Sequence, residues 1–173
     1  MNSATRAFVG LGSNLDDPRA QLDRALVALS QTPGIELRAV SSYYRTAPWG
    51  ETAQPDFLNA VAQIDTTLTA PTLLAQLIRI EATAGRTREQ RWGPRTLDLD
   101  LLLHGDTVCD TGQLQLPHPR MHERAFVLAP LAELAPDLLL APHGRVTELL
   151  AQLGAAGVQR DGDTPRTSWR TSA

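Results

Sequence analysis

The chain has 173 residues, of which 42% are hydrophobic, and a formal net charge of −3 at pH 7. This size suits one compact domain, the weak negative charge argues against a general nucleic-acid-binding protein, and no apolar run approaches the roughly 18 residues that span a membrane. All 16 basic residues are arginines, which excludes P-loop nucleotide-binding proteins and protein kinases because both need a lysine.

Hydrophobic periodicity predicts strands at 6–11, 35–45, 57–68 and 96–103, and helices at 18–30 and from 69 to about Gly85. Asp17 would cap the first helix, with Pro18 in its first turn. Gly10 and Gly12 do not complete a dinucleotide-binding fingerprint, because residue 15 is leucine. The βαββαβ order is that of a ferredoxin-like α+β fold. We expect an antiparallel sheet with two helices on one face and free loops on the other.

The remainder of the chain predicts shorter elements: strands near Val108 and at 114–116, and helices around 127–134 and 146–153. From Gly154 onward Gly, Asp, Thr, Ser and Arg dominate, a composition that favours fraying. We therefore expect a single domain over residues 1–155 and a flexible C-terminal tail over 156–173. The one cysteine, Cys109, and the absence of an apolar secretory stretch in the first residues predict a cytoplasmic location.

Asp98 and Asp100 form an Asp-x-Asp pair inside the apolar run 97–103. A strand sends both carboxylates to the same face, about 6.5–7 Å apart along the chain. Mg²⁺ takes such oxygen ligands, usually one or two carboxylates together with substrate phosphates. The alternative is an edge strand with two solvated acids, which the neighbouring arginines make less favourable.

A glycine-bounded loop at 85–95 precedes this strand, and its cations predict a phosphate clamp rather than a solvated arginine surface. These cations are Arg86, Arg88, Arg91 and Arg95. Glu81 lies at the end of the preceding helix, where a negative charge interacts unfavourably with the helix dipole. It is therefore either bound to a specific partner or simply exposed to solvent. His118 lies between prolines and suits a hydrogen bond to phosphate or a structural role. Pro119 disfavours a helix that would pair it with His122 on a metal.

Asn59 and Phe57 alternate with Leu58 and therefore face the same side of their strand. An asparagine amide offers both a donor and an acceptor, which suits the edge of a flat heteroaromatic ring. Aromatic side chains could stack on such a ring, although aromatic residues are more often part of a core. The candidates for stacking are Trp49, Phe57, Trp92 and Phe126.

The segment Arg-Trp-Gly-Pro-Arg-Thr-Leu-Asp-Leu-Asp at 91–100 resembles the signature of the 6-hydroxymethyl-7,8-dihydropterin pyrophosphokinase family. Five further segments resemble other parts of that family, and the resemblance extends over about residues 7–140: they are 10–15, 41–48, 54–59, 117–118 and 124–126. The resemblance implies transfer of pyrophosphate from ATP to the pterin hydroxymethyl group, giving AMP and the pterin diphosphate, a step of tetrahydrofolate biosynthesis. It also implies two Mg²⁺ ions, with Mn²⁺ as an alternative. We further expect a monomer without nucleic-acid or membrane partners.

The resemblance further implies roles for individual residues. The catalytic residues would be Arg86, Arg95, Asp98 and Asp100, with Asp98 and Asp100 as the metal ligands. The ATP-binding residues would be Glu81, Arg88, Arg91, Trp92, Arg95, Leu101, His118 and Arg124. The pterin-binding residues would be Thr46, Ala47, Trp49, Phe57, Asn59, Trp92, Asp98 and Phe126. The loop 85–94 would act as a lid that excludes water.

Several positions depart from the family pattern. The loop between Arg88 and Arg91 is one residue shorter, and Gln113 and Gln115 stand where the family can offer Arg and Thr to the nucleotide, which leaves the adenine contacts open. Ala47, Trp49 and Pro119 also differ from the usual residues.

Two other functions stay open. A metal-dependent nucleotidyl or glycosyl transferase would use the Asp-x-Asp pair but does not account for Asn59 and the aromatic residues. A non-enzymatic ferredoxin-like ligand-binding module would not need the paired acids.

Overall fold

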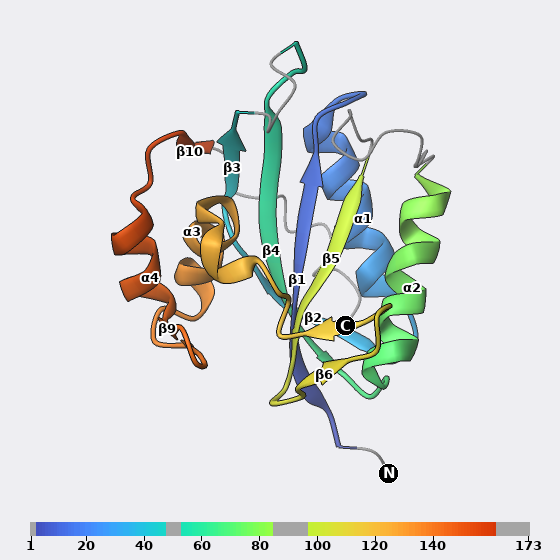
Figure 1. The fold of residues 1–173 in the computed structure, drawn as a ribbon. Coiled ribbons are helices and arrows are strands. Elements are labelled where there is room, and N and C mark those ends of the chain that lie inside the picture. Colours follow the sequence, from blue (N-terminus) through green and yellow to red (C-terminus); the bar gives the residue numbers. More distant parts are fainter. Residues whose placement is uncertain (1–2, 48–52, 85–96, 162–173) are drawn as a thin grey trace.

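The computed structural model describes residues 3–47, 53–84 and 97–161. An antiparallel sheet forms the middle layer, and helices cover parts of both of its faces (Figure 1). The elements run in the order β1 (Thr5–Ser13), α1 (Pro18–Gln31), β2 (Ile35–Val40), β3 (Tyr43–Thr46), β4 (Phe57–Thr66), α2 (Ala70–Thr83), β5 (Asp98–His104), β6 (Cys109–Asp110), β7 (Gln115–Leu116), the 3₁₀ helix η1 (Met121–Glu123), α3 (Ala125–Leu134), β8 (Leu139–Leu140), β9 (Gly144–Arg145), α4 (Val146–Leu153) and β10 (Val158–Asp161).

The main sheet has the strand order β10-β3-β4-β1-β5, and β2 also pairs with β4. All of these pairings are antiparallel. The ferredoxin-like α+β fold predicted from the sequence is therefore confirmed, with three strands rather than two between α1 and α2. None of the helices in the described part of the chain combines the length and apolar character that a bilayer span requires.

Local signals set the helix starts where the sequence places them. The Asp17 side chain accepts a hydrogen bond from the Ala20 backbone N–H at 3.3 Å, and Pro18 occupies the first turn of α1. Thr69 caps α2 in the same way by accepting from the Thr72 N–H at 3.3 Å. Each cap satisfies a backbone donor that the helix itself leaves unpaired.

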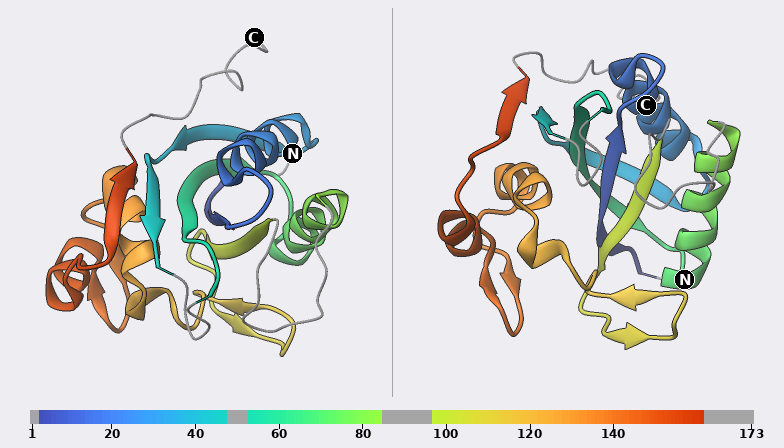
Figure 2. Two further views of the ribbon diagram at one scale, coloured as in Figure 1. Left: turned by 90° about the horizontal axis from the view of Figure 1, so that it is seen from above. Right: turned by 45° about the horizontal axis from the view of Figure 1, so that its top comes forward.

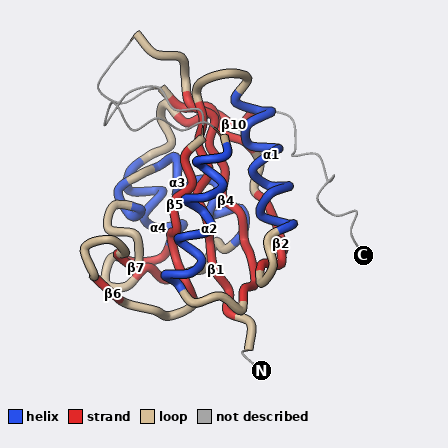
Figure 3. The backbone as a smooth tube through the Cα atoms, turned by 90° about the vertical axis from the view of Figure 1, so that its right-hand side faces the viewer, coloured by secondary structure: helices blue, strands red, loops and turns tan. Residues whose placement is uncertain are grey.

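Alternation along the strands sends one set of apolar side chains towards α1 and α2, which lie side by side against this face of the sheet (Figure 3). We call it the α1–α2 face. Leu22 and Leu26 of α1 and Leu73 and Leu77 of α2 are almost fully buried in its core. The strand residues in this core include Ala7, Val9, Leu11, Leu58, Ala60, Ala62, Ile64, Leu99 and Leu101.

The expectation of free loops on the opposite face is wrong. Viewed from above, α3 and α4 lie on the other side of the sheet from α1 and α2 (Figure 2), and we call this side the α3 face. Phe8 and Val61 pack there in a second core with Leu128 of α3. The pairing of β1 with β5 shifts between Phe8 and Val9, and both Leu102 and Leu103 join this core. Because these apolar side chains need cover, the face cannot be left to polar loops.

The predicted strand 35–45 is two strands, β2 and β3, separated at Ser41 and Ser42. The Ser41 N–H donates to the Val61 carbonyl at 2.9 Å, and the Val61 N–H donates to Ser41 Oγ, also at 2.9 Å. A serine hydroxyl thus replaces a backbone carbonyl in the ladder. The alternation of residue types cannot reveal such an interruption, because it depends on a hydrogen bond to a distant strand.

The composition from Gly154 onward predicts a tail, but Val158–Asp161 form β10, which pairs with β3. The expectation of a flexible tail is wrong for these four residues, because β3 offers an edge that their backbone can pair with. The division into a single domain over 1–155 and a tail stays a prediction for the rest, since residues 162–173 lie outside the described ranges.

Candidate active site

Two glycines of β1 form the floor of the candidate site. Register places Gly12 between Asn59 of β4 and Asp98 of β5, and Gly10 between Val61 and Asp100. Directly paired residues of an antiparallel sheet share a face, so these positions all lie on the α3 face. A Cβ atom added at Gly12 would meet Asn59 Oδ1 at 3.0 Å. The missing side chains therefore leave space on the sheet between the amide and the carboxylates.

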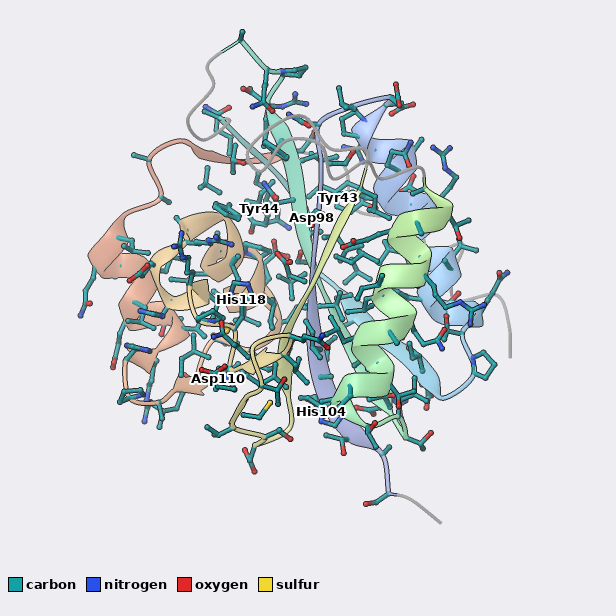
Figure 4. The ribbon with its side chains drawn as sticks, turned by 45° about the vertical axis from the view of Figure 1, so that its right-hand side comes forward. Tyr43, Tyr44, Asp98, His104, Asp110 and His118 are labelled. Carbon is teal, nitrogen blue, oxygen red and sulfur yellow. The ribbon has the colours of Figure 1, made fainter. Side chains whose placement is uncertain are left out.

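A cavity of about 370 Å³ occupies this space, a volume within the range of small-molecule sites. It lies towards the end of the sheet where β5 begins, near Asp98 and away from His104 at the far end of that strand (Figure 4). The residues predicted from the sequence that line it are Thr46, Ala47, Phe57, Asn59, Asp98, Asp100, His118, Arg124 and Phe126. They come from four strands or loops and from the start of α3, so folding assembles the site from distant parts of the chain.

One end of the cavity has an oriented amide and aromatic walls. Asn59 Nδ2 donates to Thr46 Oγ1 at 2.8 Å, and both residues are buried. This hydrogen bond fixes the orientation of the Asn59 amide. The remaining donor and acceptor of the amide therefore have fixed directions for binding the edge of a flat ring in the cavity. Phe57 and Phe126 line the cavity as well. This end can accommodate a planar heterocycle with hydrogen-bonding groups.

The segment before Phe57 is tied to the end of β1. Asn14, which is buried, donates from Nδ2 to Gln54 Oε1 and to the Pro55 carbonyl, each at 3.1 Å. These bonds hold the entry of β4 beside β1 and so support the position of Phe57 in the cavity wall.

The other end of the cavity has the two carboxylates of β5. Asp98 and Asp100 are both half-buried and both line it. Between them, the Leu99 N–H donates to Glu81 Oε1 at 2.8 Å. Glu81 is buried and does not line the cavity. It ties α2 to β5 at the point where the carboxylates emerge.

The donor set bears on which metal could bind. Within residues 3–47, 53–84 and 97–161, no group of three or more His, Cys, Asp or Glu side chains is placed to hold a metal ion. Two carboxylates at a cavity wall match a hard dication whose remaining ligands are substrate phosphates and water. The arrangement does not match a structural zinc site, which needs four protein ligands.

His118 is held as a neutral hydrogen-bond donor. Burial lowers the pKa of its ring to about 4, and the nearby Arg124 adds to this effect while Asp98 opposes it. The Arg120 N–H donates to Nδ1 at 3.2 Å, so the neutral ring carries its proton on Nε2. His118 also lines the cavity. Its Nε2–H can therefore donate to a phosphate oxygen there without depending on the solution pH near neutrality.

Arg124 and Phe126, at the start of α3, contact each other and both line the cavity. The guanidinium carbon of Arg124 lies 5.6 Å from the centre of the Phe126 ring, within the range of a cation–π contact. The cation is thereby held against the aromatic wall of the cavity, which it also lines.

Other predicted residues are placed differently. The Leu101 side chain is buried in the core of the α1–α2 face and does not line the cavity. His122 points towards the β8–β9 hairpin, where its ring stacks on His143 with centres 3.5 Å apart. The residues Trp49, Arg86, Arg88, Arg91, Trp92 and Arg95 lie outside the described ranges, so their predicted roles stay predictions.

Eight residues that line the cavity were not among those predicted from the sequence: Gly10, Leu11, Gly12, Ala60, Val61, Arg120, Glu123 and Val127. For the glycines a signal was present, because they follow Phe8 at intervals of two and so share its face. For Arg120 and Glu123 none was present, since their approach to β5 depends on the path of the chain through η1.

Comparison with known proteins agrees with this geometry. A sequence model of the family described as 7,8-dihydro-6-hydroxymethylpterin-pyrophosphokinase matches residues 8–136. A 2-amino-4-hydroxy-6-hydroxymethyldihydropteridine pyrophosphokinase of Methylorubrum extorquens is 50% identical over 156 residues, covering 90% of this chain and 98% of that protein. The protein of the same name from Pseudomonas aeruginosa is 49% identical over 155 residues, covering 90% of this chain and 96% of its own length.

Solved structures share the fold at low sequence identity. The wild-type HPPK-DHPS of Plasmodium falciparum with pteroate has a TM-score of 0.70 and 13% identity, and the match covers 88% of this chain. The same wild-type protein with SDX-DHP has a TM-score of 0.65 and 12% identity over 88% of this chain. The chain spans 43% and 45% of those longer chains, so the likeness concerns one part of them.

Proposed function

The chain belongs to the 7,8-dihydro-6-hydroxymethylpterin-pyrophosphokinase family, and from this membership we propose the reaction that it catalyses. It transfers the pyrophosphoryl group of ATP to the hydroxymethyl oxygen of 6-hydroxymethyl-7,8-dihydropterin. The products are AMP and the pterin diphosphate, and the reaction is a step of tetrahydrofolate biosynthesis.

One observation carries the proposal: a single cavity joins an oriented amide between aromatic walls to a pair of carboxylates. The pterin ring suits the first end, where Asn59 would read its polar edge and Phe57 and Phe126 would contact its faces. The hydroxymethyl group would then point along the glycine floor towards Asp98 and Asp100. The triphosphate of ATP suits this second end.

Phosphoryl transfer depends mainly on position and on electrostatic stabilisation. His118 would donate from Nε2 to a phosphate oxygen, because its Nδ1 is already occupied by the Arg120 N–H. Arg124 would place positive charge between the two substrates. The proposed roles of Arg86 and Arg95, two further phosphate-binding arginines, rest on the family motif alone. Because position and electrostatics are sufficient for this kind of transfer, the proposal requires no covalent nucleophile.

Asp98 and Asp100 would hold Mg²⁺, two ions in our proposal, with Mn²⁺ as an alternative. When bound, these ions supply positive charge to the phosphate oxygens. The protein's part is to present both carboxylates on one face of β5, which the bond from the Leu99 N–H to Glu81 supports. We also propose that the enzyme acts as a monomer and that it is cytoplasmic, the latter in keeping with the free thiol of Cys109.

The test is to incubate the protein with ATP, Mg²⁺ and 6-hydroxymethyl-7,8-dihydropterin and to follow AMP and the pterin diphosphate. We expect AMP to form only when the pterin is present. Absence of AMP with tight pterin binding would instead favour a ligand-binding module. Turnover of a sugar nucleotide without the pterin would favour the transferase alternative.

A further inference from the structure

A row of paired residues crosses the sheet from its edge to the candidate site. Arg160 of β10 pairs with Tyr44 of β3, and Tyr44 pairs with Asn59 of β4. Asn59 in turn pairs with Gly12, beside Asp98. Since paired residues share a face, Tyr44 lies next to the pterin end of the cavity, on the α3 face. Figure 4 shows Tyr44 and Asp98 towards the same end of the sheet.

Glu133 of α3 contacts this row of residues on the α3 face of the sheet. One of its carboxylate oxygens accepts a hydrogen bond from the Tyr44 hydroxyl, and the other accepts from the Ser42 N–H at 3.0 Å. Arg160 lies 4.0 Å from the second oxygen and donates from Nε to Ser42 Oγ at 2.9 Å. The cluster therefore connects α3, the junction of β2 with β3, and β10 through one carboxylate.

α3 lacks two of the features that commonly stabilise a helix, a side-chain cap at its start and an uninterrupted run of backbone donors. Arg124, at the cap position, provides no side-chain cap. Pro130 lies inside the helix and has no N–H to donate to the carbonyl four residues earlier, that of Phe126. Glu133 follows Phe126 by seven residues, about two turns, so both lie on the same side of the helix. A contact at Glu133 therefore acts on the side of α3 that carries Phe126, while Val127, Leu128 and Leu131 pack the helix into the core of the α3 face.

We propose that Glu133 is a positioning residue for the pterin end of the cavity, acting through Tyr44 to hold Phe126 over Asn59. The inference rests on the proposed function, because it assigns the Asn59–Phe126 end to the pterin. Tyr44 and Thr46 alternate on β3 and share a face. The same contact thus steadies Thr46, whose Oγ1 accepts the bond that orients Asn59.

The neighbouring residue Tyr43 provides a matched control. Its hydroxyl donates to Asp23 Oδ1 of α1 at 2.6 Å, on the opposite face of the same strand. In both tyrosines burial, with the bonded carboxylate, raises the pKa of the phenol, so both hydroxyls stay protonated donors. Tyr43→Phe and Tyr44→Phe each remove one phenol–carboxylate hydrogen bond from β3. Only Tyr44→Phe removes it on the cavity side.

The experiment measures the Kd of 6-hydroxymethyl-7,8-dihydropterin and, separately, the Kd of ATP for each purified variant. A hydrogen bond of about 1 kcal/mol corresponds to a change of about fivefold, so we expect Tyr44→Phe to weaken pterin binding by about that factor. Glu133→Ala should weaken it more than Tyr44→Phe does, by up to about 25-fold, because it removes two accepted bonds. In both variants the Kd of ATP should stay within about twofold. Tyr43→Phe should lose stability comparably but keep its pterin Kd.

A double variant, Tyr44→Phe with Glu133→Gln, should bind the pterin no more weakly than the worse of its two single variants, because the residues act through one bond. If Glu133→Ala does not fold, the comparison of Tyr44→Phe with Tyr43→Phe still decides the question. Equal pterin affinities for those two variants, with normal wild-type binding, would overturn this inference alone. Failure of the wild-type protein to bind the pterin would overturn the proposed function and this inference with it.

Discussion

The two faces of the same sheet are built from alternate residues of the same strands, yet they serve different purposes. On the α1–α2 face almost every inward side chain is aliphatic, and the two helices close over it. On the α3 face, Phe8, Val61 and Leu102 pack under α3, but the positions next to them along the strands are Gly10, Gly12, Asn59 and the two aspartates.

The difference shows how one fold separates stability from chemistry. An uninterrupted apolar face stabilises the fold by removing hydrocarbon from water. The α3 face gives up part of that contribution, because glycines bury no side chain and carboxylates resist burial. As a consequence, this face carries an open polar cavity on a rigid sheet. Substitutions on the two faces should therefore separate loss of activity from loss of stability.

The largest effect should come from the carboxylates. We expect Asp98→Ala or Asp100→Ala to lower AMP formation by about a thousandfold, the scale of removing a major transition-state interaction. The free energy of unfolding, measured in urea, should change by no more than about 1 kcal/mol. Asp110→Ala is the matched control, since Asp110 lies on the β6–β7 hairpin away from the cavity (Figure 4). Near-normal Mg²⁺-dependent turnover by either active-site variant would contradict the metal assignment.

The converse substitution lies on the α1–α2 face. Leu73 is fully buried in that core, and Leu73→Ala should lower the free energy of unfolding by about 2–5 kcal/mol, through lost burial and the cavity left behind. Turnover per folded molecule should remain that of the wild type. A large fall in kcat at a temperature where the variant is fully folded would show that the two faces are not independent.

A smaller effect should follow from filling the glycine floor. The Cβ of Gly12→Ala would meet Asn59 Oδ1 at 3.0 Å, whereas that of Gly10→Ala would meet only Leu102, at an ordinary 3.6 Å. We expect Gly12→Ala to raise the KM of the pterin by about tenfold, equivalent to about 1.4 kcal/mol, and Gly10→Ala to raise it less. Steady-state kinetics with ATP saturating would check the order of the two effects, and the reverse order would contradict the placement of the pterin.

The smallest effect concerns pH. Because burial lowers the pKa of His118 from 6.5 to about 4, the unfolded chain binds this proton before the folded one does. The contribution of His118 to stability is therefore complete above about pH 6.5 and is lost as the pH falls towards 4. NMR titration of the histidine Cε1–H signals should show His118 unprotonated at pH 5.5. His118→Gln should flatten this part of the stability curve, and a His118 midpoint near 6.5 would contradict its burial.

Much of this arrangement could be predicted from residue patterns. The cap at Asp17, the start of α2 near Thr69, the apolar stripes of α1 and α2 and the placement of Asp98 beside Asp100 all depend on residues a few positions apart. Local signals of this kind act before any tertiary contact forms. They were sufficient for the fold class and for the carboxylate pair.

Other features depended on partners far along the chain. Ser41 interrupts the expected strand because Val61 bonds to its hydroxyl. β10 forms because the edge of β3 accepts it, although its composition resembles that of a tail. The cover over the α3 face was missed because Leu102 and Leu103 both join that core at an irregular point in the pairing of β5 with β1.

The sequence by itself determined the fold class, the family motif and the two carboxylates, since spacing along one strand decides which side chains share a face. Only the tertiary structure decided that Gly10 and Gly12 form the floor between Asn59 and the aspartates, that His118 stays neutral, and that Glu133 reaches Tyr44. The physical reason is that these properties arise from register, burial and long-range hydrogen bonds. They do not exist until separate elements pack together.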